Sequence, residues 1–203
     1  MTQVVELLGY EQIKGVVSAA PFSPKRKRFI FVRHGETEGN RTRIFQTAHI
    51  PLNDTGETQA AQAAAKLRST RIGRLVASPM SRAWRTATLV GAEHAIAPEA
   101  DGALAERYYV DLWGTPVPDG GLNWGDDPPG CESLAAFVSR VSHSLLRVLA
   151  HDDRDGETVI VSHGGILLVL CAATGITLDQ AHRRNAVPLL FDGSAGAWTA
   201  TPL

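Results

Sequence analysis

The sequence has little cysteine and no long hydrophobic run. Only two of its 203 residues are cysteines, Cys131 and Cys171, which is too few for the disulfide framework of a small secreted protein. No apolar run approaches the roughly 20 residues of a membrane-spanning helix. The N-terminus also lacks the basic and apolar segments of an export signal. We therefore expect a cytoplasmic protein that does not associate with membranes.

Neither charge sign is in excess, because 20 basic residues stand against 21 acidic ones and the net charge is -1. Such a chain has no overall field that would attract nucleic acid, so we expect no nucleic-acid partner. Any preference for anions must come from a local cluster. The sequence also has no HxxxH pair or close cluster of histidines and carboxylates, so we expect no bound metal.

The length and the hydrophobic content of 44% are typical of a single compact domain. We assign residues 29–203 to this domain. Residues 1–28 are interpreted as an N-terminal extension with a short helix at about Val4–Val17. The oligomeric state is left open, with a homodimer as one option.

Strands and helices are predicted to alternate. Short apolar runs predict strands at 28–32, 74–78 and 158–162, and helical segments follow each of them, from Gly56, from Ser81 and at 165–175. A long amphipathic helix is predicted from Glu132, and two final strands at 187–192 and 196–201 look like a hairpin at a sheet edge. This order implies an α/β fold with a mostly parallel central sheet covered by helices on both faces.

Three of the predicted strands end in residues that suit an anion. The motifs are "VRHG" at 32–35, "ASPMSR" at 77–82 and "VSHGG" at 161–165. Ligands of parallel sheets bind at the carboxyl ends of the strands. We expect Arg33, Arg82 and two histidines to share a pocket for a phosphate group, since arginine matches phosphate oxygens and helix N-termini add N–H donors. Gly35, Gly164 and Gly165 would let the backbone approach the anion.

Two histidines are more than binding alone requires. An unprotonated imidazole can attack phosphorus, and nearby arginines favour the neutral ring. We assign His34 as the nucleophile and His163 as a donor to the developing charge. The segment "ALAERYYVDLWG" from Ala103 offers Glu106 as the acid that protonates the leaving oxygen.

Taken together, these motifs resemble the histidine phosphatase superfamily, in its phosphoglycerate mutase-like branch. The resemblance covers about Phe29 to Phe191 and rests on "RHGETEGN", "SPMSRAWRTA", "LAERYYVDLWG", "GCESLAAFVSR" and "VSHGG" in that order. It implies a three-layer α/β/α sandwich and a reaction without metal or organic cofactor.

The resemblance also implies a role for each matching residue. His34 becomes phosphorylated and Glu106 donates the proton, while the phosphoryl group is held by Arg33, Arg82 and His163 with help from Asn40. One position departs from the pattern. Members often carry an arginine four residues after the asparagine of the motif, where this chain has Ile44. We therefore assign no phosphate-binding role to the preceding Arg43.

The expected activity is that of a metal-independent phosphomonoester hydrolase, of the histidine acid-type phosphatase kind, acting on a small molecule. A cofactor-dependent phosphoglycerate mutase is the alternative, because Arg107 and Tyr109 resemble the mutases. A mutase needs further cations, however, and the segment 114–130 has three aspartates and no Lys or Arg. Trp113 and Trp124 are candidates for stacking on the substrate. A non-catalytic phosphate-binding module is the remaining reading.

Overall fold

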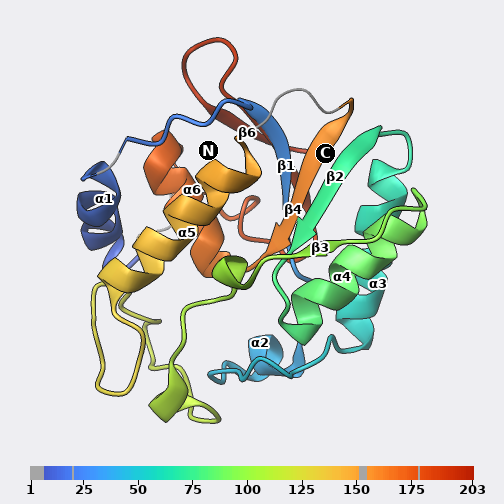
Figure 1. Cartoon of the computed structure of the whole chain (residues 1–203). Helices are drawn as coiled ribbons and strands as arrows, with labels where there is room; N and C mark the ends of the chain where they lie inside the picture. The colour runs from blue at the N-terminus through green and yellow to red at the C-terminus, as the bar shows by residue number, and fades with distance from the viewer. Residues whose placement is uncertain (1–6, 20, 151–154, 178) are drawn as a thin grey trace.

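The computed structural model describes residues 7–19, 21–150, 155–177 and 179–203. Its centre is a six-stranded sheet with the order β3-β2-β4-β1-β5-β6 (Figure 1). The strands are β1 (Arg28–Arg33), β2 (Ile72–Ala77), β3 (Glu99–Ala100), β4 (Glu157–Ser162), β5 (Pro188–Asp192) and β6 (Thr199–Pro202). The first four run parallel to one another, whereas β5 is antiparallel to β1 and β6 is antiparallel to β5. The mostly parallel sheet and its edge hairpin are confirmed.

Helices cover both faces of the sheet (Figure 1). One face carries α1 (Tyr10–Ser18), α5 (Leu134–Val148) and α6 (Gly164–Thr174), and the other carries α3 (Asp54–Leu67) and α4 (Ser81–Ala92). Two 3-10 turns, η1 (Gly102–Leu104) and η2 (Val110–Leu112), and the short α2 (Glu38–Thr42) lie outside these layers. The predicted three-layer α/β/α architecture is therefore confirmed. None of the helices in the described ranges is long and apolar enough to cross a membrane.

The alternation of side chains along β1 explains why two cores form. Phe29 and Phe31 point into the core beneath α1, α5 and α6, while Ile30 and Val32 point into the core beneath α3 and α4. Successive strand residues face opposite sides of a sheet, so a run that is apolar throughout is stable only when both faces are covered.

Two predicted helices need correction at their starts. The amphipathic helix begins at Leu134 instead of Glu132, because the Ser133 hydroxyl caps it by accepting from the Ala136 N–H. The Glu132 carboxylate instead binds Arg140 at 2.6 Å. The first helix begins at Tyr10, and the left-handed Gly9 precedes it. The predicted residues 4–6 of this helix lie outside the described residues.

The N-terminal segment packs on the same core as the rest of the chain. Ile13 and Val17 of α1 are buried among side chains of α5 and α6. The domain boundary at residue 28 stays a prediction, but helix α1 is an integral part of this layer.

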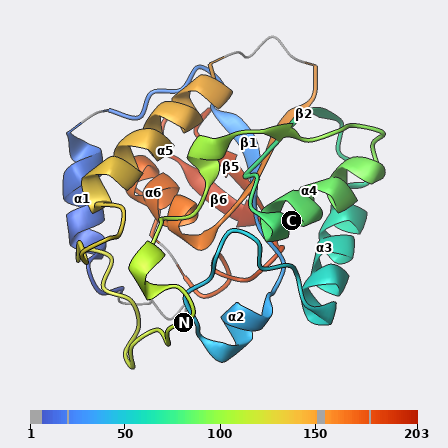
Figure 2. The same ribbon diagram turned by 60° about the horizontal axis from the view of Figure 1, so that its bottom comes forward.

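The carboxyl ends of β1, β2 and β4 meet at one edge of the sheet, because the three strands are adjacent and parallel. Figure 2, which brings the bottom of Figure 1 forward, shows α2 and the chain around η2 in front of this edge. A bridge between Ile44 and Pro116 and a hydrogen bond from the Phe45 N–H to the Thr115 carbonyl join these two segments. They enclose a space over the strand ends.

Candidate active site

Strand ends bring the two predicted histidines together. His34 follows β1, and its N–H donates to the Ser162 carbonyl at the end of β4 at 2.8 Å. His163 is the residue that follows β4, and it is the N-cap of α6. The two rings lie 5.1 Å apart between centroids and form an edge-on pair. Both side chains are buried, at 3% and 0% exposure.

The hydrogen bonds of His34 determine which nitrogen is free to react. Nδ1 lies 2.7 Å from the Gly35 carbonyl. A carbonyl oxygen only accepts, so Nδ1 carries the proton and Nε2 has a lone pair. The Arg82 Nε–H donates to this Nε2 over a long 3.3 Å. His34 is therefore held in the tautomer in which Nε2 can act as a nucleophile.

Burial and cations keep this ring neutral. The pKa of His34 lies well below 6.5 because the ring is desolvated and because Arg82 and Arg33 are close. Burial also lowers the pKa of Arg82 to about 10, so this guanidinium stays charged at pH 7. The site thus combines a neutral nucleophile with charged anion-binding groups.

His163 is oriented for a different task. Its Nε2 lies 2.8 Å from the Ser78 hydroxyl, which already accepts from the Met80 N–H. The hydroxyl proton is then available to Nε2, and the neutral ring carries its own proton on Nδ1. This Nδ1 is buried and has no hydrogen-bond partner among the described residues. Burial, reinforced by the neighbouring cations, keeps the pKa of His163 well below 6.5.

Arg33 also has an unsatisfied buried group. Its Nη1–H donates to the Arg183 carbonyl at 2.6 Å, whereas its buried Nε has no hydrogen-bond partner in the described part of the chain. Buried polar groups are almost always paired. An anion bound beside His34 would satisfy both the Arg33 Nε–H and the His163 Nδ1–H.

Glu106 is held beside the N-terminus of α6. Its Oε2 accepts from the Gly165 N–H and its Oε1 from the Arg107 N–H, both at 3.0 Å. A Cβ on residue 165 would lie 2.2 Å from Oε1 and 2.8 Å from the Trp124 ring. Gly165 is therefore required for this placement of the carboxylate.

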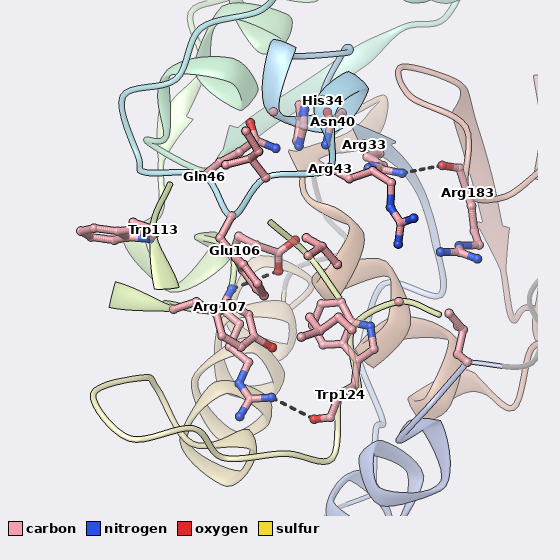
Figure 3. Close-up of a pocket in the computed structure, with 18 of the residues that line it drawn as sticks. Arg33, His34, Asn40, Arg43, Gln46, Glu106, Arg107, Trp113, Trp124 and Arg183 are labelled. Carbon is pink, nitrogen blue, oxygen red and sulfur yellow. Dashed lines mark hydrogen bonds between the residues drawn. The ribbon is translucent and has the colours of Figure 1, made fainter. Parts of the chain in front are cut away.

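A pocket of about 460 Å³ opens above the strand ends (Figure 3). This size is typical of small-molecule sites. Of the predicted site residues, its wall contains Arg33, His34, Asn40, Arg82 and Glu106. His163 and Gly164 are not among the lining residues: the His163 ring packs edge-on against His34, and a Cβ on Gly164 would lie 3.7 Å from the Arg33 Nε. Their contribution would come from the floor of the pocket.

Asn40 has a structural task as well as a place on the wall. Its Oδ1 accepts from the Thr37 N–H at 3.2 Å, and the Thr37 hydroxyl accepts from the Asn40 N–H at 3.1 Å. This reciprocal pair is a capping box at the start of α2. The amide NH2 of Asn40 is left to face a ligand.

Sequence reasoning missed several wall residues. These are Leu7, Leu8, Gln46 and Arg183, and Arg43, to which no role was assigned. No motif marks Leu8 or Arg183, because their places depend on contacts between segments that are distant in the chain. The Trp124 N–H, for example, donates to the Leu8 carbonyl at 2.9 Å.

Trp113 and Trp124 both line the pocket, as a stacking role requires. Trp124 also packs on Phe137, with ring centroids 6.3 Å apart, so it joins the core to the pocket wall. Trp113 is 36% exposed and lies at the rim.

Arg107, which resembles a residue of the mutases, lines the pocket, but its guanidinium is bound within the protein. Its side chain is fully buried and pairs with Asp127 at 2.6 Å. It also donates to the carbonyls of Trp124, Asp126 and Glu132. This arginine fixes the loop that carries Trp124.

Among the residues that the structure describes, no group of three or more His, Cys, Asp or Glu side chains is arranged to hold a metal ion. Glu106 is the one carboxylate among the described residues on the pocket wall. Three of the basic wall residues are arginines of the floor and rim, Arg33, Arg82 and Arg183. The pocket as a whole favours an anionic ligand.

The two buried histidines predict a pH-dependent stability. Unfolding returns both rings to water, where their pKa is about 6.5, while the folded pKa values lie well below that. Below pH 6.5 the unfolded chain therefore binds more protons, and the free energy of unfolding should fall by up to about 2.7 kcal/mol per pH unit. The loss continues until the folded rings themselves titrate.

Urea unfolding at several pH values between 7.5 and 5 measures this slope. Carboxylates add to it at the acid end, so the wild type is compared with His34→Gln and His163→Gln, each of which should remove about half of the histidine contribution. Equal slopes in all three proteins would contradict the assignment of two buried neutral rings.

Comparison with known proteins agrees with this geometry. Residues 29–190 match the sequence model of the histidine phosphatase superfamily (branch 1). An agropine synthesis reductase of Rhizobium rhizogenes is 32% identical over 188 residues, which cover 85% of this chain and 41% of that protein. The chain thus spans about two fifths of the length of this relative.

Two further relatives match over most of their length. A 2,3-bisphosphoglycerate-dependent phosphoglycerate mutase of Methylobacterium sp. (strain 4-46) is 32% identical, covering 80% of this chain and 89% of the mutase. A glucosyl-3-phosphoglycerate phosphatase of Mycobacterium tuberculosis is 28% identical, covering 73% and 75%. A solved structure of the mycobacterial glucosyl-3-phosphoglycerate phosphatase shares the fold, with a TM-score of 0.70 at 24% identity over 87% and 98% of the two chains. The chain therefore belongs to the histidine phosphatase superfamily.

Proposed function

We propose that this chain is a phosphomonoester hydrolase of the histidine acid-type phosphatase kind, which works through a phosphohistidine on His34 and needs no metal. The observation that carries the proposal is the arrangement around His34. Its Nε2 is unprotonated, lies beside Arg82 and faces a pocket that also holds Glu106. The substrate would be a small molecule.

In the first step the Nε2 lone pair of His34 attacks phosphorus and the ester P–O bond breaks. Glu106 acts as the general acid and gives its proton to the leaving oxygen. Arg33, Arg82 and the His163 Nδ1–H bind the three phosphoryl oxygens, with Asn40 and the backbone at Gly164 in support. The alcohol leaves and His34 carries the phosphoryl group.

In the second step the Glu106 carboxylate takes a proton from water, and the oxygen of that water attacks phosphorus. The N–P bond breaks, inorganic phosphate is released and Nε2 regains its lone pair. Glu106 therefore acts first as an acid and then as a base.

The rim of the pocket favours water over a second hydroxyl as the acceptor. A mutase must keep water from its phosphoenzyme, but here Leu8 is 52% and Trp113 36% exposed at the opening. The guanidinium of Arg107, a residue in which the acid segment resembles the mutases, is bound to Asp127 and to the Trp124 carbonyl of the loop.

A phosphoglycerate mutase is the second candidate. It is favoured by Arg43 and Arg183, which add cations to the pocket from outside the segment 114–130. The aspartates of that segment do not offset them, because none of the three lines the pocket. The reading as a non-catalytic module is less well supported, since Glu106 faces the pocket (Figure 3).

One assay separates these functions. Inorganic phosphate release is measured from a panel of phosphomonoesters in a chelating buffer, beside isomerisation of 3-phosphoglycerate with and without 2,3-bisphosphoglycerate. We expect phosphate release to be faster than isomerisation. Bisphosphate-dependent isomerisation with little phosphate release would establish the mutase. If neither reaction occurs, the non-catalytic phosphate-binding module is the remaining function.

A further inference from the structure

Besides the buried Arg107, two arginines lie on the pocket wall in addition to those that surround His34. Arg43 follows α2, and Arg183 lies in the chain between α6 and β5. In Figure 3 the two side chains enter the pocket from these different segments. Both are exposed, whereas Arg82 is buried at 3% exposure. They form an outer pair of cations, distinct from the inner anion site.

Neither outer arginine has a carboxylate partner in the described part of the chain. The one hydrogen bond of the Arg43 side chain goes from Nη2 to the Pro118 carbonyl at 3.0 Å. The Arg183 guanidinium has no hydrogen bond or ion pair among these residues, although the partial loss of water around it lowers its pKa. Exposed arginines elsewhere do pair, such as Arg85 with Glu57 at 2.9 Å. The pocket thus keeps two guanidinium groups available.

The backbone fixes the direction of Arg43. Its φ of 55° and ψ of 53° lie in the left-handed region, which costs a non-glycine residue on the order of 1 kcal/mol. The conformation is held on both sides, because the Arg43 N–H donates to the Gly39 carbonyl and the Arg43 carbonyl accepts from the Val117 N–H at 2.8 Å. Glycine or asparagine would be favoured here on backbone grounds, so an arginine suggests a use for the side chain.

Arg183 is tied directly to the inner anion site. Its carbonyl accepts from the Arg33 Nη1–H at 2.6 Å, and its positive charge helps to lower the pKa of Arg33. A cation this close to the phosphate site can reach a second group on the same small ligand.

We propose that Arg43 and Arg183 bind a second anionic group of the substrate, a carboxylate or a second phosphate, while the inner site binds the phosphoryl group that is transferred. This inference rests on the proposed function and narrows its substrate class to phosphomonoesters with a second anion. The carbon skeleton between the two groups would lie against Trp124 and Leu8, which form the apolar side of the pocket.

Matched substrates test the proposal. In 3-phosphoglycerate a carboxylate replaces the hydroxymethyl group of glycerol 3-phosphate, and in glycerol 1,3-bisphosphate the oxygen of this hydroxymethyl group carries a second phosphate. We expect kcat/KM of the wild type to be at least about 10-fold higher for one of the two compounds with a second anionic group than for glycerol 3-phosphate, and the preferred compound identifies the second anion. Arg43→Gln and Arg183→Gln should each lower that kcat/KM about 10-fold, as expected for the loss of a charged hydrogen bond, and change glycerol 3-phosphate less than about 3-fold.

Arg184→Gln is the matched control, because Arg184 is exposed, carries the same charge and does not line the pocket. It should leave the preference unchanged. Equal kcat/KM of the wild type for all three compounds would overturn the second-anion site. Equal losses of kcat/KM for all three compounds in Arg43→Gln and Arg183→Gln would do the same. Neither result would contradict the proposed phosphatase activity. If the wild type releases phosphate from no ester, the proposed function fails instead. Calorimetric titration of wild type and the double variant with 3-phosphoglycerate then decides on the second-anion site, since equal affinities would overturn it.

Discussion

Replacing His34 with alanine should lower kcat for phosphate release by a factor on the order of 10⁴ to 10⁶, as removal of a catalytic nucleophile does in other covalent enzymes. The variant keeps the cations of the pocket, but the ester can only be attacked by water, so the easier two-step route is lost. Rapid quenching in alkali with ³²P-labelled substrate should detect a phosphohistidine in the wild type and none in His34→Ala.

His143→Ala provides the matched control, because His143 is an exposed histidine of α5 far from the pocket wall. It should retain wild-type labelling and turnover. Circular dichroism checks that both variants fold. A normal level of acid-labile label in His34→Ala would remove His34 as the nucleophile, and His163 would then be the next residue to replace.

Replacing Glu106 with glutamine should separate the two proton transfers. Without the acid, kcat/KM for an alkyl phosphate is expected to fall by about 10² to 10⁴. For p-nitrophenyl phosphate, whose leaving group needs no protonation, kcat/KM should change less than about 5-fold. Without the base that activates water, however, hydrolysis of the phosphohistidine slows, and labelled enzyme should accumulate with both substrates.

Glu93→Gln controls for the loss of a carboxylate, since Glu93 pairs with Arg68 on the exposed side of α4. It should behave as the wild type with both substrates. Equal losses of kcat/KM for the alkyl and the nitrophenyl ester in Glu106→Gln would show that this carboxylate does not protonate the leaving oxygen. In that case the loss of kcat/KM would come from disturbing the hydrogen bond that the Gly165 N–H donates to the Glu106 carboxylate.

The strand-end residues could be predicted because their positions follow from local rules. An apolar run such as 29–32 fixes a buried parallel strand, and the residues that come next must lie at its carboxyl end. Arg33, His34, Arg82 and His163 are therefore brought together as the sequence predicts. Their catalytic roles remain the prediction that the variants above address.

The start of the long helix and the outer pocket wall could not be predicted in the same way. Ser133 and Glu132 are both acceptable N-terminal residues, and the choice depends on the pairing of Glu132 with Arg140. Arg43 faces the pocket because of a left-handed backbone that is fixed by a segment more than 70 residues away. Leu8 depends on its contact with Trp124. Each of these is a long-range contact without a local signal.

The origin of the wall residues bears on how such an enzyme can acquire a new substrate. Arg33 and His163 adjoin the central strands β1 and β4, which are paired on both sides, whereas Leu8, Arg43 and Trp124 belong to segments outside the sheet. Substitutions at exposed positions of those segments, such as Leu8 and Arg43, disturb neither a strand ladder nor the core, so they should cost little stability. Laboratory selection for altered specificity would therefore do best with libraries at such exposed positions, with the sheet and the core contact of Trp124 left untouched.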